Sequence, residues 1–172
     1  NHSLPMQQVD SALQAIIDSG DTAQAKALIS QKIDSNAKAL QQAQQQQAKL
    51  HFQRGVLAFN DDTHGALADF VKACELHPDY AEAWNQAGHL YDRLGQLDKA
   101  IHAYKKVQQL GNKQNDQQLI AVAVGNMGLV YQIRGELDKA KALWQQSLTL
   151  FTEVGAKPQV EQVQGWLNEL EG

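Results

Sequence analysis

The chain repeats part of itself, and this repetition restricts its fold more than any other feature. The string LGQLDKA occupies residues 94–100, and the nearly identical RGELDKA occupies residues 134–140. When the two copies are aligned on their glycines, the similarity runs over residues 81–110 and 121–150. A repeat of this size predicts stacked supersecondary units that share one continuous core.

Each copy is predicted to form two helices joined by a tight turn. Counting from the first residue of each block, position 8 is glycine, position 20 is alanine and position 24 is aromatic. Small residues at positions 8 and 20 let two antiparallel helices cross closely, and the aromatic side chains fill the layers around the crossing. These residues are Gly88, Ala100 and Tyr104 in one copy and Gly128, Ala140 and Trp144 in the other, with Tyr91 and Tyr131 at position 11.

The recurring heptapeptide is predicted to be the turn itself. Gly95 and Gly135 stand at position 15, where the first helix ends, and glycine favours the left-handed dihedrals of such a turn. Leu97 and Leu137 are expected to fill the inside of the turn. The heptapeptide therefore indicates architecture rather than a functional signature.

An earlier copy occupies residues 48–80. It has Gly55, Ala66, Phe70 and Pro78 at positions 8, 20, 24 and 32, although its two halves are one residue out of phase. Asp62 or Thr63 is expected to cap its second helix, and Pro78 to prevent that helix from continuing.

The two ends of the chain carry weaker signals. Residues 6–47 are interpreted as a degenerate hairpin with Gly20 at the turn position, and an unrelated helical hairpin stays open as the alternative. Residues 158–172 are predicted to form a last helix that starts at Pro158 and covers the apolar side of the final repeat.

This pattern resembles the tetratricopeptide repeat, which places Trp, Leu-Gly and Tyr before Ala, Phe, Ala and Pro. Trp84 supplies the aromatic residue at position 4. The resemblance implies an all-α fold, a right-handed superhelical array of antiparallel helix pairs with a C-terminal capping helix. The steps of about forty residues are similar to those of kinesin light chains and bacterial signalling proteins of this family. A single domain over residues 1–172 is expected, with segments 6–47, 48–80, 81–120, 121–157 and 158–172.

Two insertions lengthen the repeats, at residues 41–47 and 111–116, and both follow the second helix of their repeat. The first is the glutamine-rich run QQAQQQQ, which is interpreted as an overlong, solvated helix. The alternative is a coiled-coil seam with heptad spacing. That seam would run through Ile33, Asn36, Leu40, Ala43, Gln47 and Leu50.

Composition narrows the classes of partner. The net charge is −4 and the pI is near 5.8, so no basic field predicts binding to nucleic acid or an anionic membrane. No apolar run is long enough for a membrane span. Cys74 is the only cysteine, which fits a reducing compartment, and a cytoplasmic location is expected. The chain begins at Asn1, which is compatible with excision from a longer protein.

Catalytic and metal-binding signals are weak. The sequence has no GxxxxGK[ST], GxGxxG or HExxH string. Asp61 and Asp62 are adjacent, but acids in a turn usually act as caps. Cys74 and His77 have the spacing of half a metal site, yet no second pair with ligand spacing exists. We therefore predict no catalytic residue, no metal, no cofactor and no enzymatic activity.

The resemblance directs attention to the first helices, which line a concave groove in tetratricopeptide arrays. Position 6 carries an amide in three repeats, as Gln53, Gln86 and Asn126. Amides donate and accept hydrogen bonds at once, and asparagines at this position clamp ligand backbones in kinesin-light-chain-like repeats. The alternative is that surface amides are simply common in so glutamine-rich a chain. The predicted groove residues are Phe52, Gln53, Asn60, Asn85, Gln86, His89, Arg93, Asn126, Gln132 and Ile133.

The family's carboxylate clamp does not fit, because positions 5 and 9 lack the required Lys and Asn pair. We therefore do not expect this chain to bind an acidic chaperone tail. The resemblance implies a non-catalytic scaffold that binds a protein or peptide segment in the groove. The alternative is a self-assembling or spacer module of a larger protein, with a homo-oligomer as one form.

Overall fold

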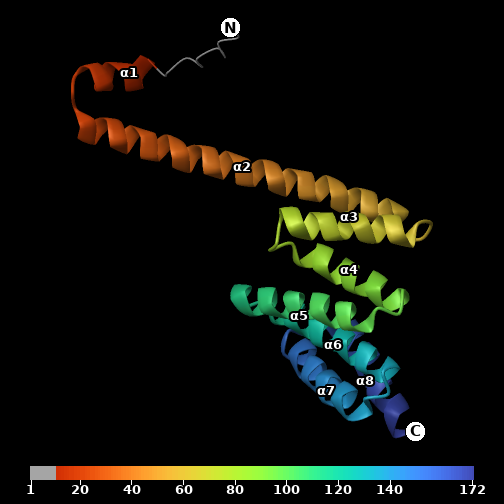
Figure 1. Cartoon of the computed structure of the whole chain (residues 1–172). Helices are drawn as coiled ribbons and strands as arrows, with labels where there is room; N and C mark the ends of the chain where they lie inside the picture. Colours follow the sequence, from red (N-terminus) through yellow and green to blue (C-terminus); the bar gives the residue numbers. More distant parts are fainter. Residues whose placement is uncertain (1–10) are drawn as a thin grey trace. The chain divides into compact units, whose positions relative to one another are not determined.

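The computed structural model describes residues 11–172, which form eight α-helices and no strand (Figure 1). The chain divides into two compact units, residues 1–46 and residues 47–172. The start of the predicted first hairpin, residues 6–10, lies outside the described residues.

The first unit contains α1 (Ser11–Asp18) and the first part of α2 (Thr22–Ala58). Gly20, with φ of 75°, makes the turn between them, and the Asp21 side chain accepts a hydrogen bond from the Gln24 amide at 3.0 Å. Ala25 is the one buried residue between residues 11 and 46. This hairpin therefore has almost no core of its own.

Helix α2 continues without a break through the boundary predicted at residues 47 and 48. The second helix of the degenerate hairpin and the first helix of the next repeat are therefore one 37-residue helix. The glutamine-rich run lies inside it, with every residue exposed except Gln45. The run thus forms part of an overlong helix whose side chains are largely solvated.

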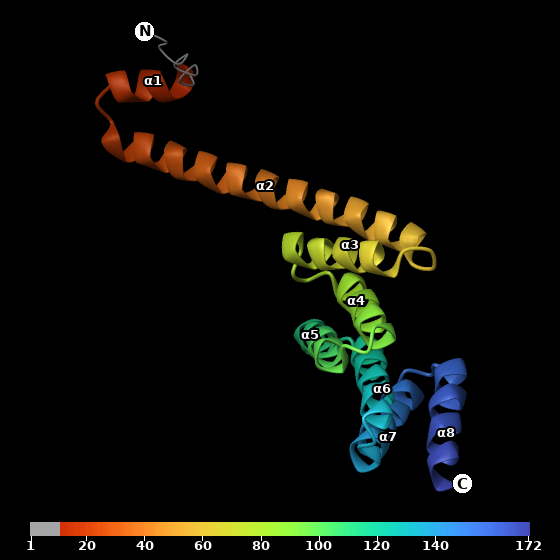
Figure 2. The same cartoon turned by 45° about the vertical axis from the view of Figure 1, so that its right-hand side comes forward.

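The second unit is an all-α solenoid of helix pairs (Figures 1 and 2). Each helix packs against the next along the chain, from α3 to α8. After residues 47–58 of α2 come α3 (Thr63–Leu76), α4 (Ala81–Arg93), α5 (Leu97–Gln114), α6 (Gln117–Ile133), α7 (Leu137–Glu153) and α8 (Lys157–Glu171).

One contact recurs in the three hairpins of this unit. The glycine of the first helix faces the aromatic ring of the second, so that a Cβ atom on Gly55 would lie 2.9 Å from the ring of Phe70. Gly88 meets Tyr104, and Gly128 meets Trp144, in the same way. All three aromatic side chains are buried. The aromatic residue at position 24 thus packs at the close helix crossing, directly against the glycine at position 8.

The left-handed turns recur with a regular spacing. At Gly95, with φ of 72°, the Gln96 amide donates to the Tyr91 carbonyl at 2.8 Å, which closes a Schellman-type helix end. The same motif follows the second helices α5 and α7, where the sequence did not predict it, but not α3. The left-handed residues are Gly95, Asn115, Gly135 and Gly155, at intervals of 20 residues (115 − 95, 135 − 115 and 155 − 135).

Other predicted boundaries agree with the structure in most cases. Asp62 caps α3, because its side chain accepts from the Gly65 amide at 2.9 Å, and the helix ends at Leu76 before Pro78. The inserted residues 111–116 extend α5 to Gln114. Leu97 packs against a core cluster, as expected, whereas Leu137 is 49% exposed because only α8 follows its hairpin.

Candidate interaction surface

A chain of hydrogen bonds connects the first helices of two neighbouring hairpins, α4 and α6. The side-chain amide nitrogen of Asn126 donates to the carbonyl oxygen of the Asn85 side chain at 2.9 Å. The Asn85 amide nitrogen lies 3.4 Å from Nε2 of His89, one turn further along α4. The hydroxyl of Tyr104, on α5, lies 3.0 Å from Nδ1 of the same imidazole.

The protonation of this network follows from burial and from the order of the bonds. Burial lowers the pKa of His89, so the imidazole is neutral near pH 7. Because the Asn85 amide donates to Nε2, the ring proton is assigned to Nδ1, which then donates to the Tyr104 oxygen. Burial also raises the pKa of Tyr104 and keeps its hydroxyl protonated.

Asn126 is the last residue of this hydrogen-bond network and keeps unused hydrogen-bonding groups. Its carbonyl oxygen and its second amide proton have no partner within residues 11–172. A cavity of about 90 Å³ lies beside it, between α6 and α8. Gln159, Gln162 and Trp166 of α8 line this cavity together with Asn126. One donor and one acceptor are thus held next to further amides.

The other position-6 amides do not form a bonded row with Asn126. Gln86 is half-buried and Gln53 is exposed, and neither side chain makes a hydrogen bond within the described residues. The Phe52 ring packs between Phe70 and Tyr80, with centroids 5.5 and 5.0 Å away, so it belongs to the core.

The remaining predicted residues lie near the ends of the first helices. Arg93 donates to the Phe59 carbonyl at 2.8 Å, and its guanidinium lies 4.4 Å from the centre of the Phe59 ring. Arg93 therefore ties the end of α4 to the turn between α2 and α3. Asn60 and Ile133 are exposed and Gln132 is half-buried, without side-chain hydrogen bonds within the described part of the chain.

Sequence reasoning missed Tyr104 and the α8 glutamines as parts of this surface. Tyr104 is also the aromatic residue that faces Gly88, and only its hydroxyl reaches the network. The α8 glutamines were overlooked because the last helix was interpreted only as a cap. Their role could have been predicted from the repeat order, because a helix that follows a complete hairpin takes the position of the first helix of the next repeat.

Between residues 11 and 172, no group of three His, Cys, Asp or Glu side chains has the arrangement of a metal site. Cys74 is buried, which raises the pKa of its thiol to about 12, and the His77 ring packs against Tyr80. None of the described helices is long and apolar enough to cross a membrane.

Comparison with known proteins supports the architecture. A family model described as a tetratricopeptide repeat matches residues 70–102, which span the end of α3, all of α4 and the start of α5. These residues therefore match a tetratricopeptide repeat. No curated protein sequence matches it significantly.

Solved tetratricopeptide-repeat structures share the fold. The N-terminal domain of stress-induced protein-1 from C. elegans is 22% identical, with a TM-score of 0.59 over 71% of this chain and 98% of that one. MamA is 28% identical, with a TM-score of 0.57 over 66% and 63%. The first repeat domain of Spaghetti, solved with the HSP90 peptide SRMEEVD, is 17% identical, with a TM-score of 0.56 over 72% and 94%.

Proposed function

We propose that this chain is a non-catalytic scaffold that binds an extended peptide segment along the concave face of its first helices. The observation that carries the proposal is the free donor and acceptor of Asn126. An extended peptide presents N–H and C=O groups side by side, and a single primary amide can bond both.

The network prepares Asn126 for this role. Its hydrogen bond to Asn85 restricts the side chain before any ligand arrives, so less conformational entropy is lost on binding. Asn85 is in turn held by His89, and His89 by the buried Tyr104. The surroundings are polar but carry few charges, which favours recognition of a peptide backbone over a strongly charged tail.

The comparison with Spaghetti supports peptide binding by this architecture in general, since that repeat domain was solved with a peptide. It does not extend to the same peptide. The SRMEEVD sequence is acidic, and the basic clamp expected for such tails is not matched at positions 5 and 9 of this chain. An uncharged or mixed sequence is the better candidate.

The test starts from peptides selected on the wild-type chain from a random displayed library, whose affinities are then measured by fluorescence anisotropy. The double variant Gln86→Ala/Asn126→Ala is expected to weaken binding at least about tenfold, or about 1.4 kcal/mol. Gln145→Ala is the matched control, because Gln145 is an exposed amide on α7. Equal affinities for the double variant and the control would refute binding by the groove.

A second candidate function is self-assembly through α2. In residues 47–58 of this helix, Leu50 is 55% exposed and Leu57, one heptad later, is 82% exposed. Exposed leucines at this spacing are typical of helices that pair. Sedimentation velocity at several concentrations tests this function. A single monomeric species at all concentrations would exclude it, whereas a dimer lost in Leu50→Gln/Leu57→Gln would support it.

A further inference from the structure

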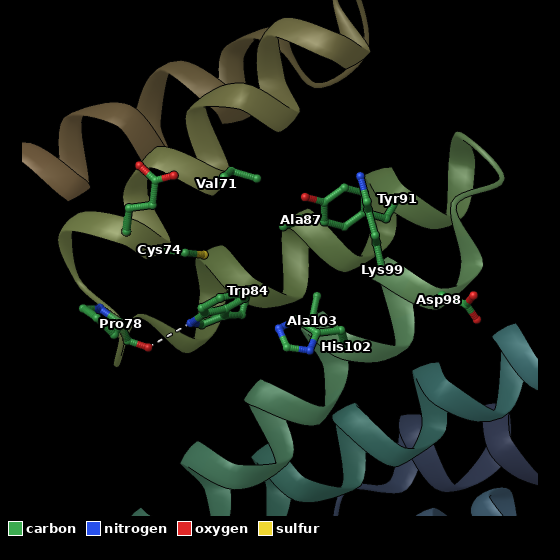
Figure 3. A pocket seen from close by; sticks show the side chains of 11 residues that line it. Val71, Cys74, Pro78, Trp84, Ala87, Tyr91, Asp98, Lys99, His102 and Ala103 are labelled. Carbon is green, nitrogen blue, oxygen red and sulfur yellow. Dashed lines mark hydrogen bonds between the residues drawn. The ribbon is translucent and has the colours of Figure 1, made fainter.

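A cavity of about 600 Å³ opens between the second helices α3 and α5, with α4 as its floor (Figure 3). Its walls are mainly apolar and include Val71, Cys74, Trp84, Ala87, Tyr91 and Ala103. The amide network of Asn85 and Asn126 contributes no lining residue. Sequence reasoning gave no indication of this cavity.

Two buried alanines, one on α4 and one on α5, line the open space. Ala87 is at position 7 of its repeat and Ala103 at position 23, and the residues 40 positions later are Met127 and Leu143. Met127 is buried in the core cluster formed by α5 and α6, and Leu143 of α7 packs against that cluster. The next repeat therefore fills the corresponding space with aliphatic side chains.

The preceding repeat occupies the same two positions with a salt bridge. Arg54 and Asp69 are the equivalents of Ala87 and Ala103, and they form two hydrogen bonds, of 2.8 and 2.7 Å. Three repeats thus use one pair of positions in three ways, as an ion pair, as two alanines and as Met with Leu. The fold itself does not require the space to be open.

Some polar groups in the walls of the cavity already have partners within the protein. The Trp84 indole N–H donates to the Pro78 carbonyl at 2.8 Å, the bond drawn in Figure 3. The edge of the His102 ring meets Trp84 at a centroid distance of 6.3 Å. The Cys74 thiol is neutral, because burial raises its pKa to about 12. The interior therefore offers mainly apolar faces, beside which the Tyr91 hydroxyl and the His102 imidazole make no hydrogen bond within the described residues.

The lining also indicates what does not bind. None of the residues that line this cavity in the described chain is Asn or Gln, so an extended peptide backbone would find no side-chain amide there. The lining also contains Glu75 and Asp98 together with Lys99 and His102, and this mixture of charged and polar groups gives little selection for a charged ligand. A volume near 600 Å³ lies within the range of small-molecule sites.

From these features we infer that the cavity between α3, α4 and α5 binds an uncharged, mainly apolar small molecule with an aromatic or branched aliphatic body. Such a ligand would pack on Trp84 and Tyr91 and occupy the space that Met127 and Leu143 fill in the next repeat. The site is distinct from the proposed peptide groove, and the inference stands independently of it.

The experiment uses the neutral fluorophore N-phenyl-1-naphthylamine, whose emission rises in apolar surroundings. Wild-type protein is expected to bind one equivalent saturably. The variant Ala87→Met/Ala103→Leu, which copies the side chains of the next repeat, should lose at least about tenfold in affinity. Ala142→Leu is the matched control, because Ala142 is an exposed alanine on α7 and adds bulk outside the cavity.

A second measurement needs no variant. Cys74 is the only cysteine and lines the cavity, so bound fluorophore should slow its alkylation by N-ethylmaleimide at least several-fold. Absence of saturable binding, equal binding by the filled variant, or unprotected Cys74 at saturation would each overturn the inference. Groove peptides should bind the filled variant as they bind wild type, so failure of one site is distinguishable from failure of the other.

Discussion

The contact between Gly128 and Trp144 can be tested with a single methyl group. In Gly128→Ala the new Cβ atom would overlap the indole edge, with Cδ1 only 2.6 Å away. Trp144 is fully buried and its indole N–H donates to the Gly125 carbonyl at 3.1 Å. The ring has no free space on the side of α6, so it must move and this hydrogen bond must lengthen or break.

Three terms set the size of the effect. Overpacking a close-packed core costs about 1–3 kcal/mol. A buried N–H left without its acceptor costs about 1–3 kcal/mol more. Replacing glycine by alanine inside a helix returns about 0.5–1 kcal/mol. The expected net destabilisation is therefore about 3 kcal/mol, within limits of about 1 and 5.5 kcal/mol, which corresponds to a fall in Tm on the order of 6–12 °C.

Gly165 provides a control of opposite sign. It lies in the exposed part of α8, and a Cβ atom built there meets nothing within 4 Å. Gly165→Ala should therefore stabilise the chain by about 0.5–1 kcal/mol through helix propensity alone. The same substitution is thus expected to have opposite effects at two helical glycines, because only one of them faces an aromatic ring.

Thermal unfolding followed by far-ultraviolet circular dichroism measures both variants, and near-ultraviolet circular dichroism reports the tryptophan environment. Gly128→Ala should lower Tm and change the tryptophan signal, while Gly165→Ala should raise Tm slightly and leave that signal unchanged. If Gly128→Ala were as stable as wild type, the glycine would not be needed for the helix crossing and the assigned repeat frame would be refuted.

Two further predictions follow from neighbouring contacts. Ala140→Leu adds bulk at a fully buried position of the helix crossing and should cost about 1–3 kcal/mol, so an unchanged thermal midpoint would contradict close packing at position 20. The second prediction concerns His89. Burial lowers the pKa of this side chain below its usual value near 6.5, so the unfolded chain binds protons more readily than the folded one. Stability is then highest above about pH 6.5 and falls as the pH drops toward the lowered value, and His89→Gln should show a smaller loss of Tm between pH 7 and pH 5. Parallel pH profiles for wild type and variant would refute a neutral, buried imidazole.

The features predicted well from the sequence are those that depend on contacts within one hairpin. The glycine at position 8, the aromatic residue at position 24 and the turn glycine at position 15 lie close along the chain and recur, so each copy supports the interpretation of the other. Gly55 with Phe70 was identified in this way despite the shifted phase of its repeat. By contrast, the sequence did not predict that α2 continues across residues 47 and 48. The repeat frame placed a boundary there, although the sequence contains no turn residue at that point.

Contacts between hairpins depend on how far one helix is offset along its neighbour, and the spacing of residues in the sequence does not specify this offset. Asn126 bonds Asn85, at position 5, and not Gln86, its counterpart at position 6. The ladder of position-6 amides stays a prediction about ligand binding. The bond between Asn126 and Asn85 is a contact within the protein that this prediction did not address.

The apolar cavity was hidden for a different reason. An alanine inside a helical repeat normally indicates close approach of two helices, as at Ala100 and Ala140, and Ala87 and Ala103 look the same in a single repeat. The two kinds of alanine can be told apart only when the same position is compared between repeats. Position 20 stays alanine in every hairpin because the crossing requires it, whereas positions 7 and 23 change together from an ion pair to alanines to Met with Leu. Variation of a pair inside otherwise constant packing indicates space that the fold leaves free for other use.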